Sequence, residues 1–292
     1  MDETTIAPEK PGLALRILRF PLTLFIVEFI LVVLVASLTS ALLLKAVKGL
    51  SDPLHLVGAV IVAVAAILAY LGCRRWIEGL AGPGEYGGPG AAKELGLGLL
   101  GGFALFSAMT GVVALLGGFE ITGHRFPGQL WAMLAMAVTS SVTEETLFRG
   151  IAFRHLETML GSWAALAITS AFFGAAHLMN PNATGFAALA IALEAGILLG
   201  GAYMLTRRLW AAIGIHAAWN FTQGWVFSVP VSGGAAPLGL FASRRIGPDW
   251  LTGGDFGLEA SAVAMVAATL AGVVLVFMAV RRGRVVRPMW AR

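Results

Sequence analysis

Long apolar runs set the strongest limit on what this chain can fold into. A helix needs about 20 mostly apolar residues to cross a bilayer, and several such runs follow one another, separated by charged or turn residues. Only 12% of the 292 residues are charged, against about 25% in soluble domains. We therefore predict an all-α fold, a polytopic membrane bundle of about eight transmembrane helices, at residues 21–44, 54–73, 95–118, 129–150, 161–180, 183–206, 209–228 and 260–280.

A short segment at each end flanks the predicted bundle. We expect residues 1–20 to form a cytoplasmic N-terminal segment, residues 21–280 the bundle, and residues 281–292 a basic cytoplasmic tail. The first apolar run is too long for a signal-peptide core, so we expect it to be retained. Two Gly- and Pro-rich stretches, 81–92 and 229–258, are predicted to be loops.

Basic residues are distributed unevenly between the two ends of the predicted helices. Of the 20 Lys and Arg residues, 15 fall at the end that holds both termini, and five fall at the opposite end. Basic residues favour the cytoplasmic side of a membrane, so both termini are expected in the cytoplasm. We assign the positive charge to topology and to attraction for membrane lipids, and we expect no binding of nucleic acid. The single cysteine excludes an internal disulfide.

Two adjacent carboxylates and an arginine stand in the fourth apolar run. An ionisable side chain inside a bilayer costs roughly 2.5–3.5 kcal/mol on insertion scales, so it is a candidate for a functional site. On a helix, Glu145 and Arg149 share one face and can pair. Glu144 lies about 100° around the helix and stays outside that pair. This arrangement predicts a general base or a metal ligand at Glu144.

Two further patterns pair a histidine with a residue four positions away. They are Phe173 with His177, and His216 with Asn220, and i, i+4 spacing places each pair on one helix face. In one interpretation, Glu144 activates a water while a histidine and Asn220 stabilise the oxyanion. In the other, Glu144, His177 and His216 hold a zinc ion with one open position.

The fourth and fifth runs are predicted to form a helical hairpin. If the chain turns near Leu160-Gly161, Glu144 and His177 lie at nearly equal distances from the turn. His216 would reach the same depth, nearer the cytoplasmic face. The residues expected to project from the hairpin tip into the cytosol are Arg154, His155 and Glu157.

Together, these three patterns resemble the CPBP family of intramembrane peptidases, which includes the type II CAAX prenyl proteases. The resemblance covers residues 130–221. It implies an endopeptidase with a cavity open to the cytosol, in which Glu144 is the catalytic base and His177, His216 and Asn220 complete the site. The expected location is a bacterial inner membrane, and the expected substrate is a peptide or a membrane protein. Supporting roles fall to Glu145, Arg149 and Phe173.

We expect the mechanism to use no cofactor, with zinc as the alternative. The sequence offers no evident fourth ligand and no acidic second shell, because Glu145 is expected to be engaged by Arg149. Two rival functions belong to other classes: a proton-coupled transporter and a catalytically silent scaffold.

The remaining intramembrane carboxylates and histidines receive simpler predictions. We expect Glu28 and Glu194 to form interhelical hydrogen bonds, with lining of the cavity as the alternative for Glu194. We expect His55, His124 and His155 to have ordinary surface roles.

Overall fold

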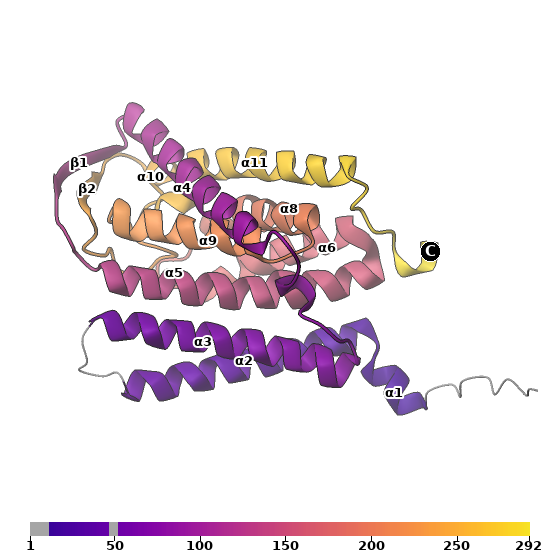
Figure 1. The fold of residues 1–292 in the computed structure, drawn as a ribbon. Helices are drawn as coiled ribbons and strands as arrows, with labels where there is room; N and C mark the ends of the chain where they lie inside the picture. The colour runs from indigo at the N-terminus through magenta and orange to yellow at the C-terminus, as the bar shows by residue number, and fades with distance from the viewer. Residues whose placement is uncertain (1–11, 47–51) are drawn as a thin grey trace, which may run out of the picture.

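The structure is a computed structural model that describes residues 12–46 and 52–292. Long helices run side by side, and their ends gather at two opposite ends of the bundle (Figure 1). Residues 1–11 of the predicted N-terminal segment, and Lys48, lie outside the described residues. We call the end where the described chain begins and finishes the terminal end, and the other the distal end. In Figure 1 the terminal end is on the right.

Six stretches of the described residues are long and apolar enough to cross a membrane. The predicted helical membrane bundle is therefore confirmed, although the count of eight spans is not. Residues 130–179 count as one of these stretches although the chain turns within them at Gly161, and the helical segment 210–226 is shorter than the others. The six stretches are Pro21–Leu43, Pro53–Glu78, Ala91–Leu115, Leu130–Met179, Gly185–Thr206 and Ala262–Arg281.

The first half of the bundle contains three long helices. Their apolar composition, with prolines at or near the start of the first two, suits helices that begin at a membrane surface. The elements are α1 (Leu13–Leu18), α2 (Pro21–Ala46), α3 (Asp52–Gly72), the π-helical η1 (Cys73–Glu78), the 3-10 turn η2 (Gly84–Tyr86) and α4 (Ala91–Leu115).

The second half carries the three sequence patterns. Side chains cap two of its helices, since Thr184 accepts a hydrogen bond from Ala187 N and Ser261 accepts one from Ala264 N. The elements are α5 (Leu130–Glu145), η3 (Thr146–Phe153), α6 (Arg154–Ala176), η4 (His177–Met179), α7 (Gly185–Ile191), η5 (Ala192–Gly196), α8 (Ile197–Thr206), α9 (Trp210–Phe221), η6 (Thr222–Val226), α10 (Asp249–Thr252), η7 (Leu258–Ala260), α11 (Ala262–Arg281) and η8 (Met289–Ala291).

The helical hairpin turns where the sequence predicts. Gly161 has φ 81° and ψ 168°, a conformation that is essentially confined to glycine, and it interrupts α6. A Cβ atom at Gly161 would also lie 2.9 Å from Val286 O. The helical segment that begins at Leu130 therefore runs on through η3 to this turn, beyond the predicted end at residue 150.

Close packing of α4 against α9 holds the histidine-bearing helix in place. A Cβ atom at Gly98 would lie 2.5 Å from Ala211 O, and one at Gly214 would lie 2.5 Å from Leu95 O. The absence of side chains at these glycines lets the two backbones approach, as small residues do between membrane helices.

Two short strands were not predicted. β1 (Phe119–His124) pairs antiparallel with β2 (Phe241–Arg245) at the distal end of the bundle. β2 lies in the connection predicted as a loop, and this connection also contributes buried residues to the core, among them Val229, Phe256 and Leu258.

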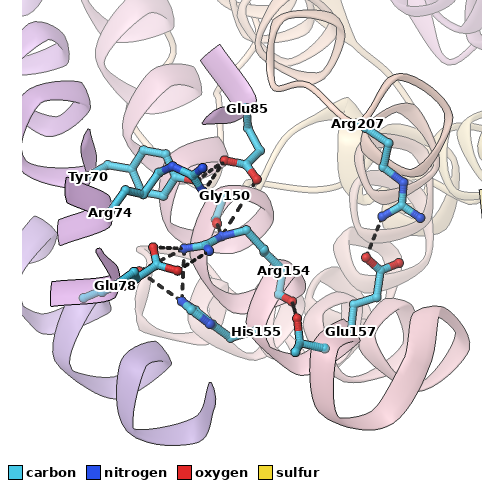
Figure 2. A network of polar contacts seen from close by, with 11 residues as sticks. Tyr70, Arg74, Glu78, Glu85, Gly150, Arg154, His155, Glu157 and Arg207 are labelled. Atoms are coloured by element: carbon cyan, nitrogen blue, oxygen red, sulfur yellow. Dashed lines mark hydrogen bonds and ion pairs between the residues drawn. The ribbon is translucent and has the colours of Figure 1, made fainter. Parts of the chain in front are cut away.

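The hairpin tip is buried in the protein, so the prediction that it projects into the cytosol is wrong. Arg154 contacts Glu78 at 2.6 Å and Glu28 at 3.2 Å, and Figure 2 shows its guanidinium surrounded by polar side chains. The predicted surface role of His155 is also wrong, because this residue is buried and lies 3.0 Å from Glu28. Glu157 is buried beside Arg207, at 2.5 Å. The tip is covered by α2 and η1, which lie more than 75 residues earlier in the chain.

The remaining predictions for these side chains have mixed outcomes. Glu28 makes the interhelical hydrogen bonds that were expected. His124 is exposed as predicted, whereas His55 is half-buried at the start of α3.

Loss of the Arg154 guanidinium is expected to destabilise the protein. Arg154→Ala would leave Glu28 and Glu78 without their cation, and breaking a buried ion pair costs about 3–5 kcal/mol. Thermal unfolding in detergent should show a clear drop for this variant and almost none for Arg282→Ala, which removes an exposed arginine. Equal stability of the two variants would contradict the assignment.

Candidate active site

The predicted pair on the fourth run forms in the structure. Arg149 Nη1 donates to Glu145 Oε1 at 2.8 Å, and Arg149 Nη2 donates to Ala195 O at 3.0 Å. Glu145 is 0% exposed and Arg149 is 1% exposed. A buried charge of this kind persists only when it is paired and hydrogen-bonded. The pair therefore joins α5 to η5 through the interior of the bundle.

Glu145 also holds His216. The same Oε1 atom lies 2.9 Å from His216 Nδ1, so the carboxylate accepts from the ring as well as from Arg149. The expectation that the site lacks an acidic second shell is therefore wrong, because one carboxylate oxygen has two lone pairs and serves both partners. With Nδ1 donating, His216 Nε2 is left to face the other glutamate.

Glu144 remains free, as predicted. Its side chain is 32% exposed, whereas that of Glu145 is fully buried. Glu144 Oε2 lies 3.9 Å from His216 Nε2 and has no hydrogen-bond partner in the protein. Two adjacent carboxylates thus have different surroundings: Glu145 is locked in the interior and Glu144 is available to a substrate.

Phe173 connects the arginine to both histidines. Arg149 Cζ lies 4.7 Å from the Phe173 ring centroid, within the range of a cation–π interaction. The Phe173 centroid lies 4.8 Å from that of His177 and 6.3 Å from that of His216. His177 Nδ1 lies 2.7 Å from Phe173 O, so Nε2 is the ring nitrogen that is not engaged in this contact. Phe173 therefore packs among the polar groups and positions them.

Asn220 bridges α9 to α5 through a residue that the sequence analysis missed. Asn220 Nδ2 donates to Ser140 Oγ at 3.0 Å. The signal for Ser140 was present in the sequence, because it lies four residues before Glu144 and shares its helix face. The amide retains a second N–H, which is not used in this bond.

The four residues predicted to be catalytic line one cavity of about 280 Å³. The rest of its wall consists mainly of apolar and small polar side chains, as in most ligand sites. The lining residues are Met133, Met136, Ser140, Glu144, His177, Asn180, His216, Asn220, Val231, Ser232, Gly234, Ala235 and Pro237.

This cavity lies towards the distal end of the bundle. The connections that contribute to its wall are those at Asn180 and at residues 231–237. A cavity open to the cytosol and termini in the cytoplasm were both expected; the lining residues place the cavity away from the end that holds the C-terminus.

A second cavity of about 30 Å³ adjoins the histidines, and two buried carboxylates line it. Glu194 Oε2 has no partner, so the interhelical bond expected of Glu194 is not found at this oxygen. Glu259, which the sequence analysis missed, accepts from Ser232 N. Burial raises the pKa of the Glu259 carboxyl to about 7. The only sequence signal for Glu259 was an acidic residue just before the last apolar run.

The alternative zinc ligands do not come together as a set. Among the described residues, one group of three His, Cys, Asp or Glu side chains has ligand atoms within 4.8 Å of one another, namely Glu28, Glu78 and His155. Arg154 Nη2 already lies 2.8–3.2 Å from an atom of each of these three. The trio of Glu144, His177 and His216 forms no such group, so these side chains do not fit a zinc ion as they are placed.

The comparison with protein families agrees with this geometry. Residues 126–222 match the family model described as type II CAAX prenyl endopeptidase Rce1-like. The match spans all seven residues singled out from the three sequence patterns. No curated protein and no solved structure matches the chain.

The two glutamates are expected to differ sharply in their effect on stability. Glu145→Gln and Arg149→Ala each leave a buried charge without its partner, so each should destabilise the protein by about 3–5 kcal/mol. Glu144→Gln alters a side chain that is 32% exposed and whose nearest charged contact, His216 Nε2, is 3.9 Å away, so it should leave the thermal unfolding temperature nearly unchanged. A similar loss in all three variants would show that Glu144 also holds the bundle together.

Proposed function

We propose that this protein is an intramembrane endopeptidase in which Glu144 activates water. The match of residues 126–222 to the family model of type II CAAX prenyl endopeptidases supports this activity. The observation that carries the proposal is the difference in contacts between the neighbouring carboxylates of Glu144 and Glu145. Glu145 is committed to Arg149 and His216, whereas Glu144 faces the cavity without a partner.

The space between Glu144 and His216 suits a water molecule. Their facing atoms are 3.9 Å apart, so one water can hydrogen-bond to both at about 2.8 Å. In the proposed reaction, Glu144 takes a proton from this water as its oxygen attacks the peptide carbonyl carbon. The protonated Glu144 then gives the proton to the nitrogen of the leaving amine, and the carboxylate is restored.

Asn220 and the histidines are assigned to the developing oxyanion. Asn220 Nδ2 uses one N–H in its bond to Ser140, so its second N–H remains available to a bound molecule. The Asn220 side chain also lines the cavity. His216 Nδ1 faces Glu145 and its Nε2 faces Glu144 at the cavity, so a hydrogen on Nε2 would be placed to donate to the oxyanion. Donors fixed in advance in a site of low dielectric stabilise such charge strongly.

A zinc-dependent form of the same peptidase is the second candidate. One observation favours it, because a carboxylate that accepts from the distal ring nitrogen of a histidine is typical of metal sites, and Glu145 does so with His216. The spread of Glu144, His177 and His216 weighs against it. A transporter and a silent scaffold have less support, since each of the three patterns contributes at least one residue to the wall of one cavity.

We further propose a bacterial inner membrane as the location, with both termini in the cytoplasm. The uneven distribution of Lys and Arg supports this orientation. The substrate is a peptide or a protein associated with the membrane.

Removal of the proposed base is expected to abolish turnover without unfolding the protein. Glu144→Gln should lower the rate of peptide cleavage by about 10²–10⁴-fold, the usual contribution of a general base. The rate would be measured with purified protein in detergent on a quenched fluorescent peptide library. Glu120→Gln, which alters an exposed carboxylate on β1, is the matched control and should cleave normally. Wild-type turnover in Glu144→Gln would rule out this role.

Metal removal tests the choice between the two mechanisms. Purified protein is expected to hold far less than one metal ion per chain and to keep cleaving peptide in the presence of a chelator. Elemental analysis and activity after dialysis give the two measurements. Stoichiometric zinc, with activity lost on chelation and restored by metal, would instead support the zinc-dependent form, with Glu145 orienting His216.

A further inference from the structure

We infer that the active-site cavity opens on the non-cytoplasmic side of the membrane, so that the enzyme cleaves peptide segments presented at the outer surface. The substrate part of this inference rests on the proposed function. The sidedness rests only on the fold and on the distribution of charge.

The wall of the cavity belongs to the distal end. Among the described residues, those that line it from interhelical connections are Asn180 and five residues between Val231 and Pro237. In Figure 1 the connections that follow α6 and α9 lie with β1 and β2, far from the chain terminus. No residue of a connection at the terminal end lines the cavity.

The distal connections are fixed in place around the cavity. Gly233 N donates to Phe256 O at 2.8 Å, and Asn182 Nδ2 donates to Gly233 O at 3.0 Å. Gly233 has φ 78°, and a Cβ atom there would lie 1.7 Å from Pro181 O. Since glycine alone fits this position, the segment is held between two other connections and forms a defined rim.

The terminal end is filled by packed side chains. Every residue of η3, which runs from the site towards that end, is buried. η2 then covers the start of α9, where Leu209 N donates to Glu85 O and Trp210 Nε1 donates to Tyr86 O. The polar network of Figure 2 lies in the same region, with Glu78 and Glu85 around Arg154. The interior at this end is therefore occupied by protein.

Charge distinguishes the two ends. The terminal end carries exposed arginines with no carboxylate partner among the described residues, and five of them are in the C-terminal segment. At the distal end, Arg244 is paired with Glu120 at 2.7 Å, which cancels part of the small positive charge there. With 15 basic residues against five, the terminal end is the one that the positive-inside rule places in the cytoplasm. The arginines of the C-terminal segment are Arg281, Arg282, Arg284, Arg287 and Arg292.

The chemistry of the rim indicates the kind of segment it accepts. Apart from Glu144 and the two histidines, the lining residues are uncharged. An acidic peptide would be repelled by Glu144, and there is no Lys or Arg in the lining to hold a free carboxylate. The preferred substrate is therefore an uncharged stretch of a membrane-associated protein or peptide, next to the outer surface.

Cysteine labelling tests the sidedness without using activity. The only natural cysteine, Cys73, is buried and can be replaced by alanine to give a clean background. Ala235→Cys places a thiol on the exposed rim, and Arg282→Cys places one on the exposed terminal end. In right-side-out membrane vesicles, a maleimide that cannot cross the bilayer should label Ala235→Cys at once and Arg282→Cys only after permeabilisation.

The reverse pattern, or equal labelling of both variants in sealed vesicles, would overturn the inference. Should Ala235→Cys fail to accumulate, Ala236→Cys, on the same exposed stretch, gives the same readout. A reporter that is active only outside the cytoplasm, fused after Arg292, gives an independent check and should be silent.

Cleavage in the same vesicles separates this inference from the proposed function. A quenched peptide library that cannot cross the bilayer should be cut by right-side-out vesicles with wild-type protein and not with Glu144→Gln. Cleavage only in inside-out vesicles would refute the sidedness and keep the peptidase. Labelling as expected with no cleavage on either side would keep the sidedness of the cavity and refute both the peptidase and the substrate assigned to it.

Discussion

One carboxylate oxygen organises the centre of this molecule. Glu145 Oε1 accepts from Arg149 and from His216, so a single atom joins α5, η3 and α9. An ionised group is too costly to bury in an apolar bundle unless it is paired and hydrogen-bonded. The helices must therefore pack so that all three side chains meet. That meeting fixes the His216 ring and turns its Nε2 towards Glu144.

The different roles of two neighbouring glutamates follow from helix geometry. Successive residues point about 100° apart around a helix, so Glu145 enters the interior while Glu144 reaches the cavity. The same reasoning predicted from the sequence that Glu145 pairs with Arg149 while Glu144 stays outside that pair, together with the hairpin turn near Gly161. Intramembrane charges and i, i+4 spacing are local features, and they can be read without knowing which helices become neighbours.

Features that depend on distant segments could not be predicted in this way. His155 was expected at a surface because nothing nearby in sequence covers it, yet Glu28, 127 residues away, lies beside it. Glu145 was expected to serve Arg149 alone, since the proximity of His216 arises from the packing of α9. Likewise, charge counting orients the helices but does not say which end of the bundle is open. That depends on how residues 231–237 fold back over the site.

The two ends of the bundle meet different physical requirements. A site that relies on electrostatics needs donors and acceptors held rigidly in a region of low dielectric, because reorganisation during the reaction would cancel the benefit. The terminal end meets this need by enclosing Arg154 among carboxylates and by burying all of η3 behind Glu145. A hydrolase also needs water and an extended peptide beside its base. The distal end meets that need with a rim that includes glycine, serine and asparagine. Hydrogen bonding at Gly233 fixes the backbone of this rim. The wall of the cavity carries no ionisable side chain besides Glu144 and the two histidines. Placing rigidity at one end and the cavity at the other lets the proposed base, Glu144, line the cavity without loosening the bundle around it.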